Sequence, residues 1–161
     1  MELLIPSEFM MTRLFLTLAV LSISPALVHA EDEPQADPVA SSLGATGAQA
    51  VLSTFFALSE LADLYGSEVY DKEKTTQLAS MFAGTSASVN KSLTELIASD
   101  KLSKENNASI QEMVVINELL SKMANGIKEI VADPSDANEA AYQKNRETTW
   151  KAISKFLALK D

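Results

Sequence analysis

Residues 113–130 read MVVINELLSKMANGIKEI, and this stretch decides the fold class of the chain. Apolar side chains return every three or four residues, the spacing that places them on one face of an α-helix. The positions concerned are Met113, Ile116, Leu120, Met123, Ile127 and Ile130. No segment after residue 45 shows a convincing alternation with the period of two that indicates a strand. We therefore predict a long amphipathic helix here and an all-α fold.

Three further helical patterns flank this stretch. We expect the first, second and fourth helices to follow Thr46, Asp71 and Pro134, and the third to begin between residues 103 and 109. The predicted buried face of the second helix comprises Leu78, Phe82, Thr85, Val89, Ser92 and Leu96. Four such helices with short connections most economically form an antiparallel up-down-up-down four-helix bundle. A dimer of helical hairpins and an irregular all-α domain are the alternatives.

An apolar segment precedes the helical region. Residues 14–27, LFLTLAVLSISPAL, have the length of a secretory signal and are too short to span a bilayer. Arg13 precedes this run, and small side chains lie before the acidic residues that follow Ala30. We expect residues 1–30 to be a signal peptide, and we expect export to the periplasm, with an extracellular location as the alternative.

The expected leader also bears on the domain boundaries. The first ten residues contain no basic residue, so the true start is Met1, Met10 or Met11. Residues 31–45 contain four acids and two prolines but few large apolar side chains, which predicts a flexible acidic linker. The bundle domain is then expected to occupy residues 46–161.

The chemistry available to the mature chain is narrow. The only histidine of the sequence, His29, lies in the expected signal peptide, and the sequence has no cysteine. The ligands of zinc, haem and di-iron sites and the Ser-His-Asp and Cys-His catalytic systems would therefore be missing. Glu60 and Asp63 lie one turn apart, but a solvated acidic surface explains them more simply than a cation site. We predict no cofactor, no metal and no catalytic residue; carboxylate, lysine or tyrosine chemistry is the enzymatic alternative.

One group of polar residues falls near the helix midpoints, on or next to the predicted inward faces. It could form a hydrogen-bonded layer that sets the register of the bundle, or line a small ligand cavity in the core. Arg146, the only arginine after Arg13, lies one turn before Trp150 and is expected to be a structural residue or a ligand anchor. The aromatic residues are spaced as core, with no surface cluster. The midpoint residues are Ser59, Thr85, Asn117 and Thr149.

The net charge of the whole chain is −9, and the expected mature chain keeps 20 acidic and 12 basic residues. Scattered lysines among acids argue against nucleic acid or an anionic membrane as partner, whereas a basic protein is permitted. We expect an exported, non-enzymatic helical bundle that binds another protein as an inhibitor, immunity-type or chaperone-like factor. We expect a monomer or homodimer without a membrane anchor. The alternative is a small-molecule carrier with a ligand cavity in the bundle core.

Overall fold

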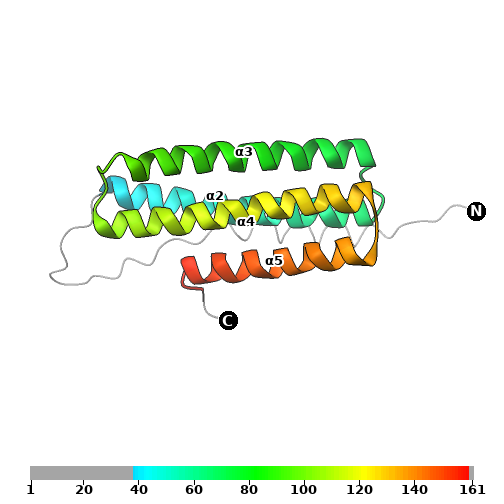
Figure 1. The fold of residues 1–161 in the computed structure, drawn as a ribbon. Coiled ribbons are helices and arrows are strands. Elements are labelled where there is room, and N and C mark those ends of the chain that lie inside the picture. Colours follow the sequence, from blue (N-terminus) through cyan, green and yellow to red (C-terminus); the bar gives the residue numbers. More distant parts are fainter. Residues whose placement is uncertain (1–37, 160–161) are drawn as a thin grey trace, which may run out of the picture. The chain divides into compact units, whose positions relative to one another are not determined.

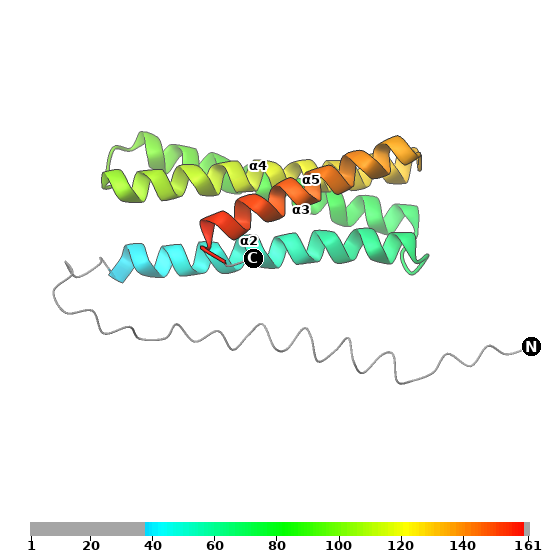
Figure 2. The ribbon, with the colours of Figure 1, turned by 90° about the horizontal axis from the view of Figure 1, so that it is seen from below.

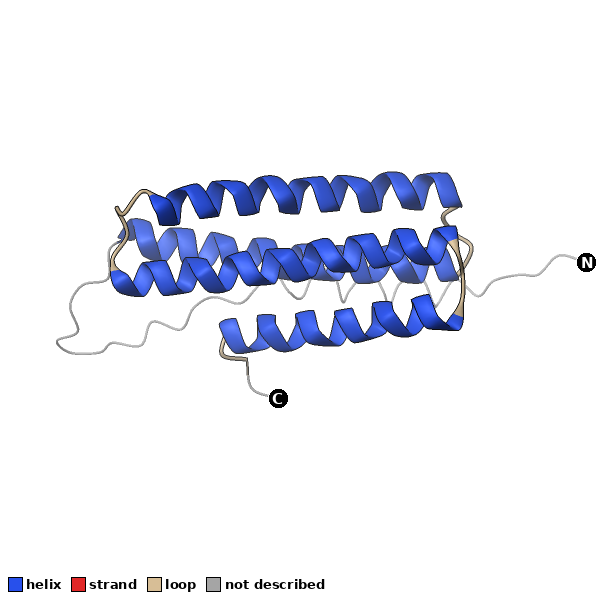
Figure 3. Ribbon diagram, in the orientation of Figure 1, coloured by secondary structure: helices blue, strands red, loops and turns tan. Residues whose placement is uncertain are grey.

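Residues 38–159, the part of the chain that the computed structural model describes, form four α-helices that pack against one another (Figure 1, Figure 3). These are α2 (Pro38–Gly66), α3 (Lys72–Ala98), α4 (Lys104–Ala132) and α5 (Asp136–Phe156). No strand occurs between residues 38 and 159. The prediction of an all-α fold with four packed helices is confirmed. The expected signal peptide, residues 1–30, lies outside the described residues.

Polar side chains cap the starts of α3 and α4. The Asp71 carboxylate accepts a hydrogen bond from the backbone amide of Lys74 at 2.8 Å, as expected for an N-cap. The Ser103 hydroxyl oxygen accepts one from the amide of Asn106 at 3.2 Å. Both bonds satisfy amides of the first turn that have no partner inside the helix. The third predicted helix therefore begins at the early end of the expected interval.

The first helix begins at Pro38 and not at Thr46. Residues 38–45 are helical, so the prediction of a flexible linker up to residue 45 is wrong for them. All four acids of that predicted linker precede Pro38, and the composition of the segment therefore changes at this proline. Proline is favoured in the first helical turn because the amide hydrogen that it lacks has no partner there.

The core is organised around α4. This helix contacts α2, α3 and α5, whereas α3 and α5 do not contact each other in the described part of the chain. Figure 2 shows α5 running obliquely between α4 and α2 and ending short of the level where α2 begins. Burying a leucine or isoleucine contributes roughly 1.5–3 kcal/mol to stability. The buried side chains are mainly those of Val51, Phe55, Leu58, Leu61, Ile116, Leu120, Met123, Ile127, Tyr142 and Ile153.

Small side chains bring α3 close to α4, the two helices with the most extensive contact. The buried residues of α3 are Thr75, Ala79 and Ser86. Thr85, Val89 and Ser92 are exposed, so the predicted inward face is wrong at these positions. Small residues on the contact face let the helix backbones approach, and the larger Leu78 and Phe82 then lie half-buried beside it.

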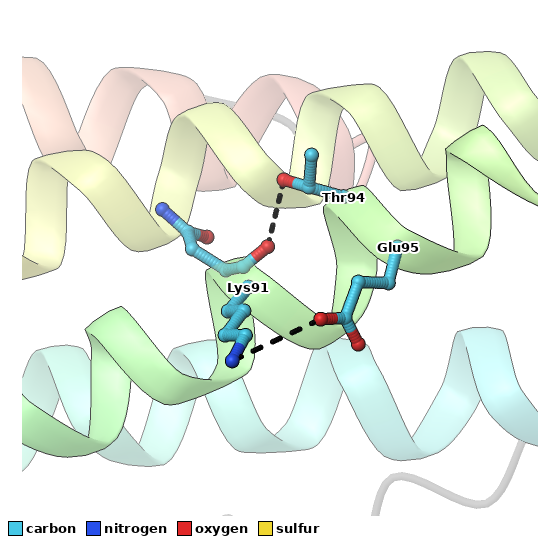
Figure 4. A network of polar contacts seen from close by, with 4 residues as sticks. Lys91, Thr94 and Glu95 are labelled. Atoms are coloured by element: carbon cyan, nitrogen blue, oxygen red, sulfur yellow. Dashed lines mark hydrogen bonds and ion pairs between the residues drawn. The ribbon is translucent and has the colours of Figure 1, made fainter.

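The outer face of α3 carries only local polar contacts (Figure 4). The Lys91 ammonium lies 4.0 Å from the Glu95 carboxylate one turn away, and both side chains are exposed. The Thr94 hydroxyl donates a hydrogen bond to the carbonyl oxygen of Asn90 at 2.8 Å. An ion pair so exposed to water and salt adds little to stability. This network is a solvated helix surface.

Candidate functional site

The polar residues that the sequence predicts near the helix midpoints do not all lie in the core. Ser59, Asn117 and Thr149 are buried on α2, α4 and α5, whereas Thr85 faces solvent. Arg146 is half-buried at the surface of α5. Three of the five candidate residues therefore lie in the core.

The buried polar side chains bond mainly within their own helices. The Asn117 side-chain amide donates to the carbonyl oxygen of Met113 at 3.1 Å. The Thr149 hydroxyl donates to the carbonyl oxygen of Asn145 at 2.7 Å. The Ser59 hydroxyl is buried and has no hydrogen-bond partner among the described residues. These bonds satisfy Asn117 and Thr149 locally, and neither bond joins two helices.

An aromatic groove lies between α2 and α5. It has a volume of about 380 Å³, is open to solvent and is lined by Phe55, Phe56, Gln143, Arg146, Glu147 and Trp150. The ring of Phe55 lies 5.3 Å from that of Trp150 and 5.6 Å from that of Phe56, between centroids. Phe55 is only 6% exposed, but Phe56 is 48% and Trp150 38% exposed. Two large aromatic side chains thus lie at the surface over a buried third ring.

The prediction that these aromatic residues form only core, with no surface cluster, is wrong. Consecutive residues of an α-helix point about 100° apart, because the helix has 3.6 residues per turn. Phe55 points into the core, so its neighbour Phe56 points to one side of this direction and lies half exposed. Thr149 is fully buried, and its neighbour Trp150 is displaced toward solvent in the same way. The sequence contained a signal for this cluster, because α2 and α5 each have a large aromatic residue next to a residue of the buried face.

An acidic groove of about 1050 Å³ continues from the aromatic one toward the end of the bundle where α2 joins α3. Gln143 lines both grooves. Lys72 is the only basic residue among the described residues that line the acidic groove, and the half-buried Tyr65 and Tyr70 add aromatic surface. Its carboxylates are those of Asp63, Glu68, Asp71, Asp136 and Glu139. The two grooves form one surface along α5, apolar at one end and negatively charged at the other.

Tyr142 supports this surface from below. Its hydroxyl donates a long hydrogen bond, 3.4 Å, to the carbonyl oxygen of Leu58 and so links α5 to α2. Burial raises the pKa of Tyr142 to about 12; the nearby Arg146 charge lowers the pKa and Asp63 raises it, both by less than burial does. The phenol is therefore neutral at physiological pH, and its hydrogen bond to α2 gives Tyr142 a structural role.

The carboxylates do not converge on a point. In the part of the chain that the structure describes, no group of three or more acidic or histidine side chains could hold a metal ion. Glu60 and Asp63, considered as a cation pair from their spacing, are both exposed. None of the helices formed by residues 38–159 is long and apolar enough to cross a bilayer.

Comparison with known proteins adds no relative. No protein-family model matches the chain, and no curated protein or solved structure shows significant similarity to it.

Proposed function

We propose that this chain is an exported, non-enzymatic helical-bundle protein that binds another protein through the aromatic groove. The observation that carries the proposal is the pair of exposed rings, Phe56 and Trp150, side by side above Phe55. Aromatic side chains dominate the energy of many protein interfaces because each buries a large area at little entropic cost. Such a cluster is uncommon on a surface that meets only water.

We also propose that the four helices form an antiparallel bundle and that residues 1–30 direct export. Short connections at residues 67–71, 99–103 and 133–135 support an antiparallel up-down-up-down bundle, since helices joined so closely pack as neighbours. The leader-like sequence of residues 1–30 supports export. A protein that acts in the periplasm as an inhibitor, immunity-type or chaperone-like factor would need only a binding surface.

A non-enzymatic role has its support in the available side chains. Residues 38–159 contain neither histidine nor cysteine. Tyr142 is the titratable group there with a clearly raised pKa, a consequence of its burial, and its hydroxyl is already bonded to a backbone carbonyl. Acid-base and covalent catalysis most often use histidine or cysteine, and neither occurs in residues 38–159.

Affinity capture tests the proposal. The tagged protein, recovered from the exported fraction of its native cells, is expected to retain one specific protein, and Phe56→Ser with Trp150→Ser should reduce retention at least tenfold. The control is Met81→Ser with Val115→Ser, since these side chains are as exposed, 56% and 53%, but line neither groove. Equal retention by wild type, groove variant and control variant would refute the proposal.

The small-molecule carrier remains the second candidate because of one observation. The buried Ser59 hydroxyl has no partner among the described residues, and a ligand in the core would supply one. Native mass spectrometry of the freshly purified protein is the test: a co-purifying compound that is lost in Ser59→Ala supports the carrier. A single mass equal to that of the polypeptide eliminates it.

A further inference from the structure

We infer that the partner segment bound between α2 and α5 is a basic amphipathic helix, with apolar side chains over the aromatic groove and lysines or arginines over the acidic groove. This inference rests on the proposed function and adds the chemistry of the partner. Three properties of the surface select such a partner: its charge, its length and its polarity.

The charge of the surface selects a basic partner. Five carboxylates and one lysine line the acidic groove, and the aromatic groove adds one arginine and one glutamate that balance each other. The two ion pairs within residues 44–159, Lys91 with Glu95 and Lys155 with Glu112, involve none of these carboxylates. Apart from Asp71, which caps α3, these carboxylates are therefore available to a ligand, and complementary charge both attracts and orients a partner.

The length of the surface fits a helix. From Asp136 to Trp150 the groove-lining residues extend along α5 by about 21 Å, the rise of four helical turns. A partner helix of about 15 to 18 residues would cover this distance. Residues 38–159 form no strand and offer no sheet edge for an extended peptide, whereas an amphipathic helix in a groove matches an apolar groove and a charged groove that together extend over four turns.

The polarity of the surface sets the direction of binding. Along α5 the acids Asp136 and Glu139 come first, Gln143 lies between the grooves, and Trp150 comes last. The aromatic groove has no net charge because Arg146 and Glu147 balance each other, so the basic part of a partner is attracted to the acidic groove. The charged end of the bound helix therefore lies near residue 136, and its apolar end lies near Trp150.

A synthetic amphipathic helix tests the inference. The probe is an 18-residue helical peptide whose groove-facing side chains are lysines along one half of its length and leucines along the other; its two controls replace all lysines by glutamate or all leucines by serine. Fluorescence of Trp150, the single tryptophan, reports binding to the full protein. We expect the leucine-lysine peptide to bind at least tenfold more tightly than either control peptide.

Two triple variants with the same net charge distinguish an effect of the acidic groove from an effect of net charge. Asp63→Asn with Glu68→Gln and Glu139→Gln removes three groove charges and leaves the capping residue Asp71 intact. We expect at least tenfold weaker binding and a smaller salt dependence. The control variant changes the same number of exposed charges outside both grooves, on α3 and α4, and should stay within twofold of wild type: Glu95→Gln, Glu118→Gln and Glu129→Gln.

Three outcomes would overturn the inference. The first is equal weakening by both triple variants, which would reduce the effect to net charge. The second is preference for the glutamate peptide. The third is concentration-dependent self-association lost in Trp150→Ser, which would make a second copy of the chain the occupant. If the peptide test fails but capture of a protein depends on the groove, the proposed function stands and only the inference about the partner is wrong. If capture does not depend on the groove, the proposed function and the inference are both wrong.

Discussion

At the scale of single residues, the direction of neighbouring side chains decides what the surface presents. Phe55 and Phe56 are adjacent and chemically identical, yet Phe55 is buried at the base of the aromatic groove and Phe56 is exposed beside it. Thr85 and Ser86 form a similar pair, with the serine buried. The helical period was readable from the sequence, but the phase of α3 was not, because small and polar residues occupy both of its candidate faces. A prediction based on apolar residues favours the face of α3 with the larger side chains. In the structure, close packing against α4 instead buries the face with the smaller ones.

The orientation of α3 can be tested at this pair. Ser86 is 4% exposed against neighbouring helices, so Ser86→Leu should overpack the contact and cost about 1–3 kcal/mol of unfolding free energy. Thr85→Leu at the exposed neighbour should stay within about 0.5 kcal/mol of wild type. Urea denaturation followed by circular dichroism measures both. A larger loss for Thr85→Leu than for Ser86→Leu would restore the face expected from the sequence.

Tyr142 predicts a pH dependence of stability. Burial raises its pKa to about 12 in the folded chain, whereas a tyrosine in the unfolded chain ionises near 10. Between these values the unfolded state binds fewer protons, so the free energy of unfolding should fall by up to about 1.4 kcal/mol per pH unit. The contribution is fully present below pH 10 and is lost as the pH rises toward 12.

Replacement of the phenol isolates this effect. Tyr142→Phe should remove that part of the decline in stability between pH 10 and 12, and Tyr70→Phe, at a half-buried tyrosine, should keep it. Urea midpoints measured at intervals over this range give both slopes. Identical slopes for the two variants would mean that Tyr142 ionises as an ordinary tyrosine.

At the scale of the elements, sequence patterns located all four helices but missed one boundary. Aspartate and serine caps predicted the starts of α3 and α4, since their side chains serve backbone amides within a single turn. The start of α2 at Pro38 was missed because acidic composition was averaged over residues 31–45, although every acid precedes that proline. Local hydrogen bonding is thus readable from the sequence, whereas averaged composition conceals a sharp change at one residue.

Gly84 in the middle of α3 gives a prediction about helix stability. It is exposed, and no atom lies within 4 Å of where a Cβ would be placed, so nothing packs against it. Gly84→Ala should therefore raise the unfolding free energy by up to about 1 kcal/mol. The mirror variant at the exposed Ala87, Ala87→Gly, should lower it by a similar amount. Thermal unfolding compares them, and a destabilising Gly84→Ala would indicate that the glycine has a packing partner.

At the scale of the whole molecule, the groove arises from how two distant segments meet. Phe56 and Trp150 are far apart in the sequence, and only the packing of α2 and α5 against α4 brings their rings to 6.2 Å between centroids. Sequence patterns do not state which helices are neighbours, and the candidate site therefore could not be predicted from them. Of the five polar candidates predicted from the sequence, Arg146 alone lines the aromatic groove. Ser59, Asn117 and Thr149 are core, and Thr85 is exposed on α3.

Site-specific photo-crosslinking in living cells tests the central claim most directly. A photoreactive phenylalanine at position 56 is expected to form one discrete adduct with a partner protein, and the same residue at position 115, equally exposed on α4, should form none. The Trp150→Ser substitution should abolish the adduct from position 56. Adducts of equal yield from positions 56 and 115, or none from position 56, would contradict a protein-binding groove between α2 and α5.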